Sequence, residues 1–193
     1  MNLPYTLGID PGNAGGLALL NGAQEIDQLW RMPKRKGRID WNELVSILQD
    51  IHSTYGVEVA LEKQMPFTSK DRNNKSVVMA GTGIMLENYG RLKLCLEWSG
   101  LENYDEYYPA AWSAAYRQRQ PRKRKGGQSP QEKIVEDNRS NKEKNAVIAN
   151  GIWRGAAVLH GKLWNEGTRD AALIARYHQD LRRRKEIEQR AQR

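Results

Sequence analysis

The sequence predicts an α/β domain in which helices flank a five-stranded mixed sheet. Two observations support this fold class. Short segments with apolar residues at every second position predict strands, and they cluster in the first half of the chain. Longer segments with apolar residues three and four positions apart predict helices. The predicted order is three strands, a helix, a strand, a helix, a strand and then helices only.

The first three strands are predicted to form an antiparallel meander. Residues 5–10 alternate apolar and polar side chains and end at Asp10, where the segment DPGNAGG turns the chain. The apolar run GLALL at 16–20 is the second strand, and residues 24–31 return as the third. Residues 33–38, which are rich in Lys and Arg, are then expected to form a loop that closes the meander.

One helix and one strand follow the meander. Asp40 can cap the helix with its side chain, Glu43 lies three residues later, and an apolar stripe continues to Gly56. The segment VEVALE at 57–62 has its larger apolar side chains on one face and predicts the fourth strand. This strand ends at a carboxylate, Glu62.

The remainder of the chain is predicted to be mainly helical. Two glycines at 81 and 83 lower helix propensity and indicate a close backbone approach to a neighbour. The predicted elements are a polar loop at 63–75, a helix at 76–92, a fifth strand LKLCLEW at 92–98, a helix at 109–116, and helical segments at 131–150 and from Thr168 onward.

Residues 117–130, RQRQPRKRKGGQSP, interrupt this pattern. They hold six basic residues, no acidic ones, two prolines and two glycines, and such a segment cannot bury enough apolar surface to order itself. We therefore expect one domain over residues 1–193, with a mobile basic insert at about 117–130. A basic helical extension is expected at about 179–193.

The composition excludes several classes of protein. The 193 residues suit one domain, and no apolar run approaches the roughly 20 residues of a membrane-spanning helix. No secretory signal pattern is visible at the start of the sequence. The one cysteine, Cys95, excludes a disulfide framework and a cysteine-ligated zinc site within one chain. We expect a cytoplasmic protein, associated with the nucleoid or made in a phage-infected bacterium.

The charge is divided unevenly along the chain. Residues 1–116 hold 11 basic and 14 acidic side chains, whereas residues 117–193 hold 20 and 9. A strongly basic segment is typical of proteins that bind a polyanion, because Lys and Arg release counterions from phosphates. Nucleic acid is the expected partner, and a merely solvated basic surface is the alternative.

Three carboxylates occupy positions where chemistry is expected. Asp10 ends the first strand, Glu62 ends the fourth, and Asp170 shares a helical stripe with apolar residues. Each has a simpler interpretation, since Asp-Pro-Gly is a common turn, Glu62 can be an ordinary polar strand residue, and an acid suits the first turn of a helix. If the two strands are neighbours and the last helix packs across them, the three acids converge. They would then raise one another's pKa values or bind a hard divalent cation, Mg²⁺ or Mn²⁺.

Three segments resemble known acidic motifs in the same order along the chain. GIDPGNAGG at 8–16, ALEKQ at 60–64 and DAALIARYH at 170–178 are similar to those of the RuvC-type Holliday junction resolvases, a group with a ribonuclease H-like fold. YYPAAWSAAY at 107–116 and NKEKNAV at 141–147 resemble the helical region before the last acid. The resemblance covers roughly residues 4–178, and a phage-encoded member would suit the small size and the basic insert.

The resemblance implies a metal-dependent endonuclease that nicks four-way DNA junctions as a symmetric homodimer. Asp10, Glu62 and Asp170 would hold two Mg²⁺ ions, with Mn²⁺ able to substitute. The family's fourth ligand falls on Gly167, which departs from the pattern, and Glu166 is the nearest substitute. The residues expected to contact DNA are Phe67, by base stacking, and the cations Arg117, Arg119, Arg122, Lys123, Arg124, Lys125, Lys142 and Lys144.

Other functions compete with this interpretation. An actin-like ATPase or sugar kinase begins with a similar strand and turn, but it needs a duplicated domain for which 193 residues leave no room. A non-catalytic branched-DNA-binding protein on the same fold is a second alternative. A nuclease acting on forks, flaps or RNA–DNA hybrids is a third.

Overall fold

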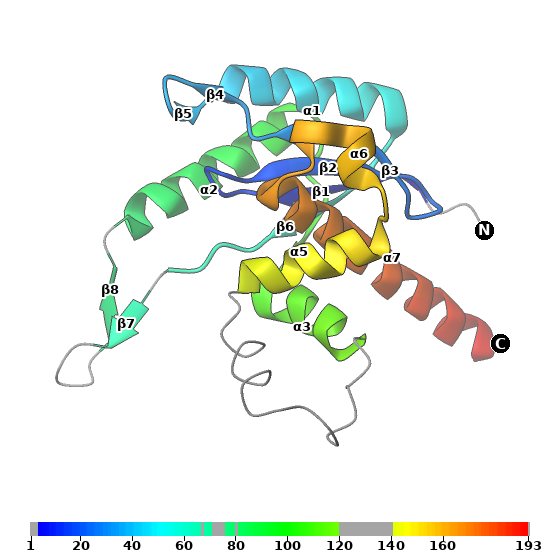
Figure 1. Ribbon diagram of the computed structural model, residues 1–193. Coiled ribbons are helices and arrows are strands. Elements are labelled where there is room, and N and C mark those ends of the chain that lie inside the picture. The colour runs from blue at the N-terminus through cyan, green and yellow to red at the C-terminus, as the bar shows by residue number, and fades with distance from the viewer. Residues whose placement is uncertain (1–3, 67, 71–75, 80, 120–140, 193) are drawn as a thin grey trace.

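Five strands form one mixed sheet at the centre of the protein (Figure 1). The computed structural model describes residues 4–66, 68–70, 76–79, 81–119 and 141–192. The sheet order is β3-β2-β1-β6-β9, with β1 antiparallel to β2, β2 antiparallel to β3, and parallel pairs β1–β6 and β6–β9. The strands are β1 (Thr6–Asp10), β2 (Gly16–Leu20), β3 (Ile26–Arg31), β6 (Glu58–Glu62) and β9 (Tyr104–Tyr107). The predicted five-stranded mixed sheet is confirmed.

Helices cover both faces of the sheet, and each face has its own hydrophobic core. One core packs apolar side chains of β1 and β6 against α1 (Trp41–Tyr55) and α2 (Thr82–Trp98). The other packs the opposite face against a second group of helices. This group contains α3 (Pro109–Arg119), α5 (Asn141–Ile152), α6 (Ala156–His160), the short 3₁₀ helix η1 (Gly161–Leu163) and α7 (Glu166–Ala191).

The first helix is confirmed in detail. The Asp40 side chain accepts a hydrogen bond from the backbone N–H of Glu43, which satisfies a donor that the helix itself leaves free. Gly56 ends α1 in the left-handed conformation that glycine adopts at low cost.

The predicted fifth strand is wrong. LKLCLEW is the last part of α2, where Leu92, Cys95 and Leu96 are buried while Leu94 and Trp98 are exposed. Buried positions three and four apart follow the period of a helix, and the sequence pattern over seven residues was too short to separate it from a strand. Strand β9 takes the fifth place instead, with a sequence, YDEY, that gives little strand signal.

Short hairpins occupy two segments that were predicted differently. β4 (Lys34–Arg35) pairs with β5 (Arg38–Ile39), where a loop was expected. β7 (Thr68–Lys70) pairs with β8 (Ser76–Val78), so the helix expected from 76 begins only at Thr82. These segments are too short for a hydrophobic period to show. Their strands form because each pairs with the other strand of its hairpin.

Three smaller expectations also change. The last helix begins at Glu166 and is capped by Asn165, while Thr168 completes the reciprocal capping box. α3 extends to Arg119, three residues into the expected mobile insert. Among the described residues, none lies within 4 Å of a Cβ added at Gly81 or Gly83, and Gly81 instead caps α2 with a φ of 87°.

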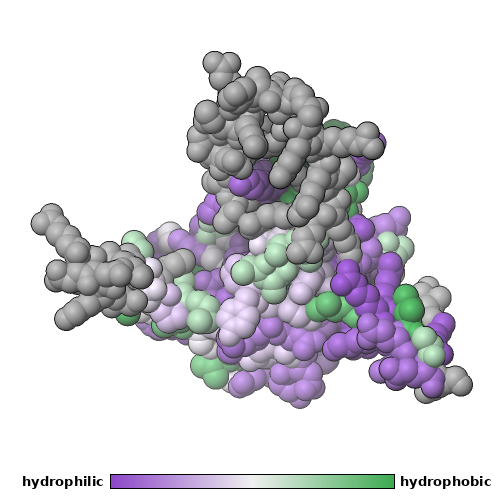
Figure 2. Space-filling view, turned by 90° about the horizontal axis from the view of Figure 1, so that it is seen from below, coloured by the Kyte–Doolittle hydropathy of each residue, from purple (hydrophilic) through white to green (hydrophobic). Residues whose placement is uncertain are grey.

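The long helix α7 lies across β1 and β2 with almost no side chains between them. A Cβ on Gly8 of β1 would lie 2.0 Å from the carbonyl oxygen of Ala171, and one on Gly16 of β2 would lie 2.8 Å from the Thr168 side chain. Glycine is therefore required at these positions by contact rather than by backbone conformation. Beyond the sheet, α7 continues as a hydrophilic arm (Figures 1 and 2).

Helices of the described segments are all too short or too polar to cross a membrane.

We predict that Gly8→Ala destabilises the protein by about 3 kcal/mol, because the added methyl group must push α7 away from β1. Gly90→Ala is the matched control. Gly90 lies within α2 with open space around it, and there alanine should stabilise by about 0.5–1 kcal/mol. Urea denaturation of both variants measures the difference, and equal stabilities would show that α7 does not lie directly on β1.

Candidate metal and nuclease site

The alternation of β1 and β6 puts two carboxylates on the face that α7 covers. Leu7 and Ile9 point into the core formed with α1 and α2, so Asp10 at the end of β1 points to the other face. Glu62 ends the parallel neighbour β6 on the same face as Ala60, which packs in the core under α7. Carboxyl ends of adjacent parallel strands meet at one edge of a sheet, the usual place for a site in such folds.

Asp10 is held in the turn that follows β1. Its Oδ1 accepts a hydrogen bond of 2.9 Å from the backbone N–H of Gly12. Burial raises the pKa of Asp10 to about 6, against the lowering effect of this hydrogen bond, and the nearby charge of Glu166 raises it further. The ammonium of Lys142 acts in the opposite direction.

Glu62 is held by two donors from different elements. Trp112 of α3 donates from Nε1 at 3.2 Å and Gln64 donates from Nε2 at 3.3 Å. Burial raises the pKa of Glu62 to about 8, and repulsion from Asp10 and Asp170 adds to the effect. Trp112 is buried in the core, as expected for a packing residue, but its indole N–H also orients this carboxylate.

Asp170 comes from the second turn of α7. Asn145 of α5 donates from Nδ2 to its Oδ1 at 3.2 Å. Burial raises the pKa of Asp170 to about 7, and the charges of Asp10 and Glu166 also raise it. The three predicted acids therefore interact electrostatically in one place, as the sequence analysis expected.

A fourth carboxylate, Glu166, joins them from the first turn of α7. The helix is continuous through Gly167, so Glu166 and Asp170 lie four residues apart on one face. Gly167 itself cannot carry a side chain, because a Cβ there would lie 2.3 Å from the carbonyl oxygen of Ala14. Lys142 of α5 forms an ion pair with Glu166 at the rim of the cluster.

Helix α5 brings one of its two candidate lysines to the carboxylates. Lys142 and Asn145 are three residues apart and share a face of the helix, which is turned to Glu166 and Asp170. Lys144 is about 200° around the helix from Lys142 and forms no ion pair with any described carboxylate.

Asn145 is the site residue that the sequence analysis missed. It is 6% exposed, and its Oδ1 atom is buried without a hydrogen-bond partner among the described residues. The signal that could have found it is its spacing of three from Lys142 on a helix already expected near the last acid.

The other expected DNA contacts cannot be placed. Phe67 and the four cations at 122–125 lie outside the described residues, and Arg117 and Arg119 lie in α3 with side chains that the structure does not describe.

The donor set fits a hard divalent cation. Three partly buried carboxylates repel one another, and a buried acceptor, Asn145 Oδ1, has no donor among the described residues. Oxygen donors of this kind suit Mg²⁺ or Mn²⁺. As the described side chains stand, no three His, Cys, Asp or Glu residues are arranged to hold one ion. An ion held here would therefore need these carboxylates to rotate out of their present hydrogen bonds.

Comparison with known proteins shows the fold. No protein-family description and no curated protein matches the sequence. Among solved structures, the chain is similar to RuvC of T. thermophilus, in a structure described as a complex with Holliday junction substrate. The TM-score is 0.56 and the sequence identity 15%, with 91% of this chain and 92% of that chain covered. The mixed sheet and its helices therefore have the ribonuclease H-like arrangement of that protein.

We predict that the metal-free protein loses stability as the pH rises from about 4 to about 8. The raised pKa values of Asp10, Glu62 and Asp170 mean that the folded state keeps protons which the unfolded chain releases near pH 4. The free energy of unfolding is thus greatest below pH 4, where the three carboxyls are protonated in both states. It falls with rising pH until the pH passes their pKa values in the folded protein. Added Mg²⁺ should restore stability at pH 8.

Thermal unfolding at pH 5.5 and pH 8, with EDTA and with Mg²⁺, measures this dependence. Asp10→Asn should flatten the profile in EDTA, because it removes one of the repelling charges. A profile that is equally steep in Asp10→Asn and the unmodified protein would contradict electrostatic coupling at the site.

Proposed function

We propose that this protein is a metal-dependent endonuclease that resolves four-way DNA junctions. The observation that carries the proposal is the meeting of Asp10, Glu62 and Asp170, each with a raised pKa, at the carboxyl edge of a ribonuclease H-like sheet. The similarity to T. thermophilus RuvC supports the nuclease class, and the Holliday junction in the structure of that protein supports branched DNA as substrate.

Each residue has a distinct task in this proposal. Asp10, Glu62 and Asp170 would hold two Mg²⁺ ions, and Glu166 is the additional ligand. When bound, these ions would act as Lewis acids that polarise the scissile phosphate and make the attacking water more acidic. Trp112 and Gln64 keep Glu62 oriented by donating to it.

Lys142 and Asn145 support the site from α5. Lys142 now neutralises Glu166, and exchange of that partner for a phosphate oxygen would place its charge beside the substrate. Asn145 holds Asp170 with its amide nitrogen and leaves its buried oxygen available to an ion or a water molecule.

A homodimer is part of the proposal, because paired nicks in a junction need two sites. The exposed face of α2 supports it. Ile84, Leu94 and Trp98 are 66%, 47% and 71% exposed, and their spacing of ten and four residues keeps them on one stripe. Between them, Arg91 pairs with Glu87 at 2.7 Å. Such a stripe can pair with its own copy around a two-fold axis.

Forks, flaps and RNA–DNA hybrids are alternative substrates. Binding of branched DNA without cleavage is an alternative function. Gel assays with a four-way junction, a fork, a linear duplex and a hybrid, all with Mg²⁺, distinguish them. The junction should be cut by symmetric nicks and the duplex should not. Equal cutting of the duplex would contradict the junction assignment and keep the nuclease class.

We predict that Asp10→Asn lowers the cleavage rate by about a thousandfold or more and leaves junction binding within about twofold. The carboxylate is partly buried at the site and is not one of the exposed cations that would bind the DNA backbone. Cleavage rates and binding by gel shift in Ca²⁺ test this. Persistence of cutting in the purified variant would show that the site is elsewhere.

We predict that Leu94→Glu with Trp98→Glu converts the dimer to a monomer, because two buried charges would face each other across the α2 contact. The matched control is Val158→Glu with Leu159→Glu, which changes two exposed apolar residues of α6, 87% and 81% exposed. Mass measured by light scattering should halve in the first variant only. A dimer that survives in the first variant would exclude α2 as the interface.

A further inference from the structure

We propose that residues 31–38, here called the basic segment, bind the phosphate backbone of the DNA beside the carboxylate site. This segment joins β3 to α1 and contains five cations, Arg31, Lys34, Arg35, Lys36 and Arg38. The inference rests on the proposed nuclease function and adds a DNA-binding surface to it. None of the residues expected from the sequence to contact DNA lies in this segment.

The hairpin of this segment presents a lysine at its tip in a conformation that lysine disfavours. Arg35 pairs with Arg38 across β4 and β5, so Lys36 and Gly37 are the two turn residues. Their φ angles are 53° and 78°, the left-handed values of a type I′ turn. Asparagine, aspartate or glycine usually fills the first of these positions, and a lysine there is uncommon. Lys36 therefore makes the turn less stable than asparagine, aspartate or glycine would make it at this position.

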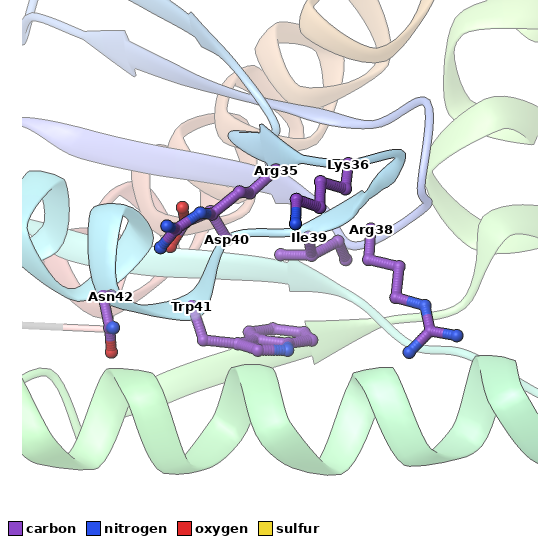
Figure 3. Close-up of a pocket in the computed structure, with 7 residues that line it drawn as sticks. All are labelled: Arg35, Lys36, Arg38, Ile39, Asp40, Trp41 and Asn42. Carbon is purple, nitrogen blue, oxygen red and sulfur yellow. The ribbon is translucent and has the colours of Figure 1, made fainter.

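A hollow of about 550 Å³ lies between the hairpin and the start of α1 (Figure 3). Arg35, Lys36 and Arg38 line it together with Trp41, Asn42, Ile39 and Asp40. Figure 3 shows Arg35 and Arg38 extending to opposite sides of the hairpin, so that the cations are spread along it.

The three cations of the hollow have no acidic partner within the part of the chain that the structure describes. None of the described carboxylates forms an ion pair with Arg35, Lys36 or Arg38, and all three side chains are exposed. The one acid of the hollow, Asp40, accepts from the N–H of Glu43 and caps α1. The hollow keeps a net positive charge, which fits a polyanion.

A second hollow of about 450 Å³ continues the basic segment toward the carboxylates. Arg31 and Lys34 line it on one side, and residues 13–15 of the turn after Asp10 line it on another. Glu166, the first residue of α7, lies at its edge. The Arg31 guanidinium donates to the carbonyl of Lys162. Lys34, the other cation of this hollow, is exposed and forms no ion pair with a described carboxylate.

Lys34 lines the second hollow and its sequence neighbour Arg35 lines the first, and cations spread over two hollows fit a chain of phosphates better than a single small anion. Exposed Lys and Arg side chains on a hairpin adapt to successive phosphates, whereas a site for one small anion needs fixed, buried donors. Glu166 lines the second hollow, and its charge acts on both Asp10 and Asp170, so a strand bound in that hollow would lie near these acids. The basic segment would thus hold the strand that leads into the cleavage site.

Binding measured in Ca²⁺ tests the proposal with Arg35→Gln, Lys36→Gln and Arg38→Gln in one variant. Loss of up to three phosphate contacts should raise the junction Kd about tenfold or more near physiological salt. The slope of log Kd against log salt should fall by about two to three. Hydroxyl-radical footprints should lose protection on the strand beside the cut.

The control variant removes the same charge from the far end of α7, by Arg184→Gln, Lys185→Gln and Arg190→Gln. This end lies away from the hairpin (Figure 1). Its junction Kd should change by less than about twofold. Equal weakening in both variants, or none in the hairpin variant, would overturn the proposal. If the unmodified protein neither binds nor cuts the junction, the proposed function fails instead.

A single substitution separates charge from structure. Lys36→Asn suits the turn better than lysine does, so the midpoint of thermal unfolding should stay equal or rise while junction affinity falls about twofold to threefold. A role limited to folding would move both measurements together. Junction affinity equal to that of the unmodified protein would exclude Lys36 from the DNA contact.

Discussion

The direct contact of α7 with β1 and β2 is the constraint on which the site depends. Gly8 lets the backbone of α7 reach the strand, since its missing Cβ would fall 2.0 Å from the Ala171 carbonyl. Farther along the helix, Gln179 donates to Thr6 at 3.1 Å and the buried His178 lies 2.9 Å from Glu58. The helix is therefore held to the sheet at several points. A larger distance between α7 and the sheet would move Asp170 away from the carboxylates at the ends of β1 and β6.

The same close packing explains the unusual order of acids at the start of α7. Gly15 and Gly167 form a bridge between the turn after β1 and the helix, and a side chain at 167 would overlap the turn. A carboxylate at that position is therefore incompatible with this turn. Glu166 lies one residue earlier, outside the overlap, and still shares a helix face with Asp170.

Electrostatics and packing oppose each other at this edge of the sheet. Burial of Asp10, Glu62 and Asp170 raises the pKa of each carboxyl and makes the site receptive to a cation. The neutral donors Trp112, Gln64 and Asn145 orient two of these acids without cancelling their charge. Only Lys142 supplies a paired positive charge among the described ion pairs of the four acids, and it lies at the rim. This division leaves the centre acidic and the surroundings basic, which suits phosphodiester chemistry.

The sequence by itself determined the elements whose patterns are long or capped. Alternation identified β1 and β6, an apolar run identified β2, and the side chain of Asp40 with Gly56 fixed the ends of α1. It also singled out Asp10, Glu62 and Asp170, because two strand ends and one helix stripe could bring them together and because three motifs in order resemble those of one family. The segment LKLCLEW was predicted as a strand because seven residues fit either period. It forms the end of α2, which packs against α1.

Tertiary structure alone decided the rest. Trp112 carries no local sign of a role and Asn145 only its spacing from Lys142, and they reach the carboxylates because α3 and α5 pack beside α7. The hairpin at Lys34–Ile39 depends on pairing across a two-residue turn, which periodicity does not reveal. The hydrophobic pattern of one segment indicates which of its side chains face solvent and which face the core. It does not indicate which residues of distant segments lie together in a site, because that depends on how the segments pack.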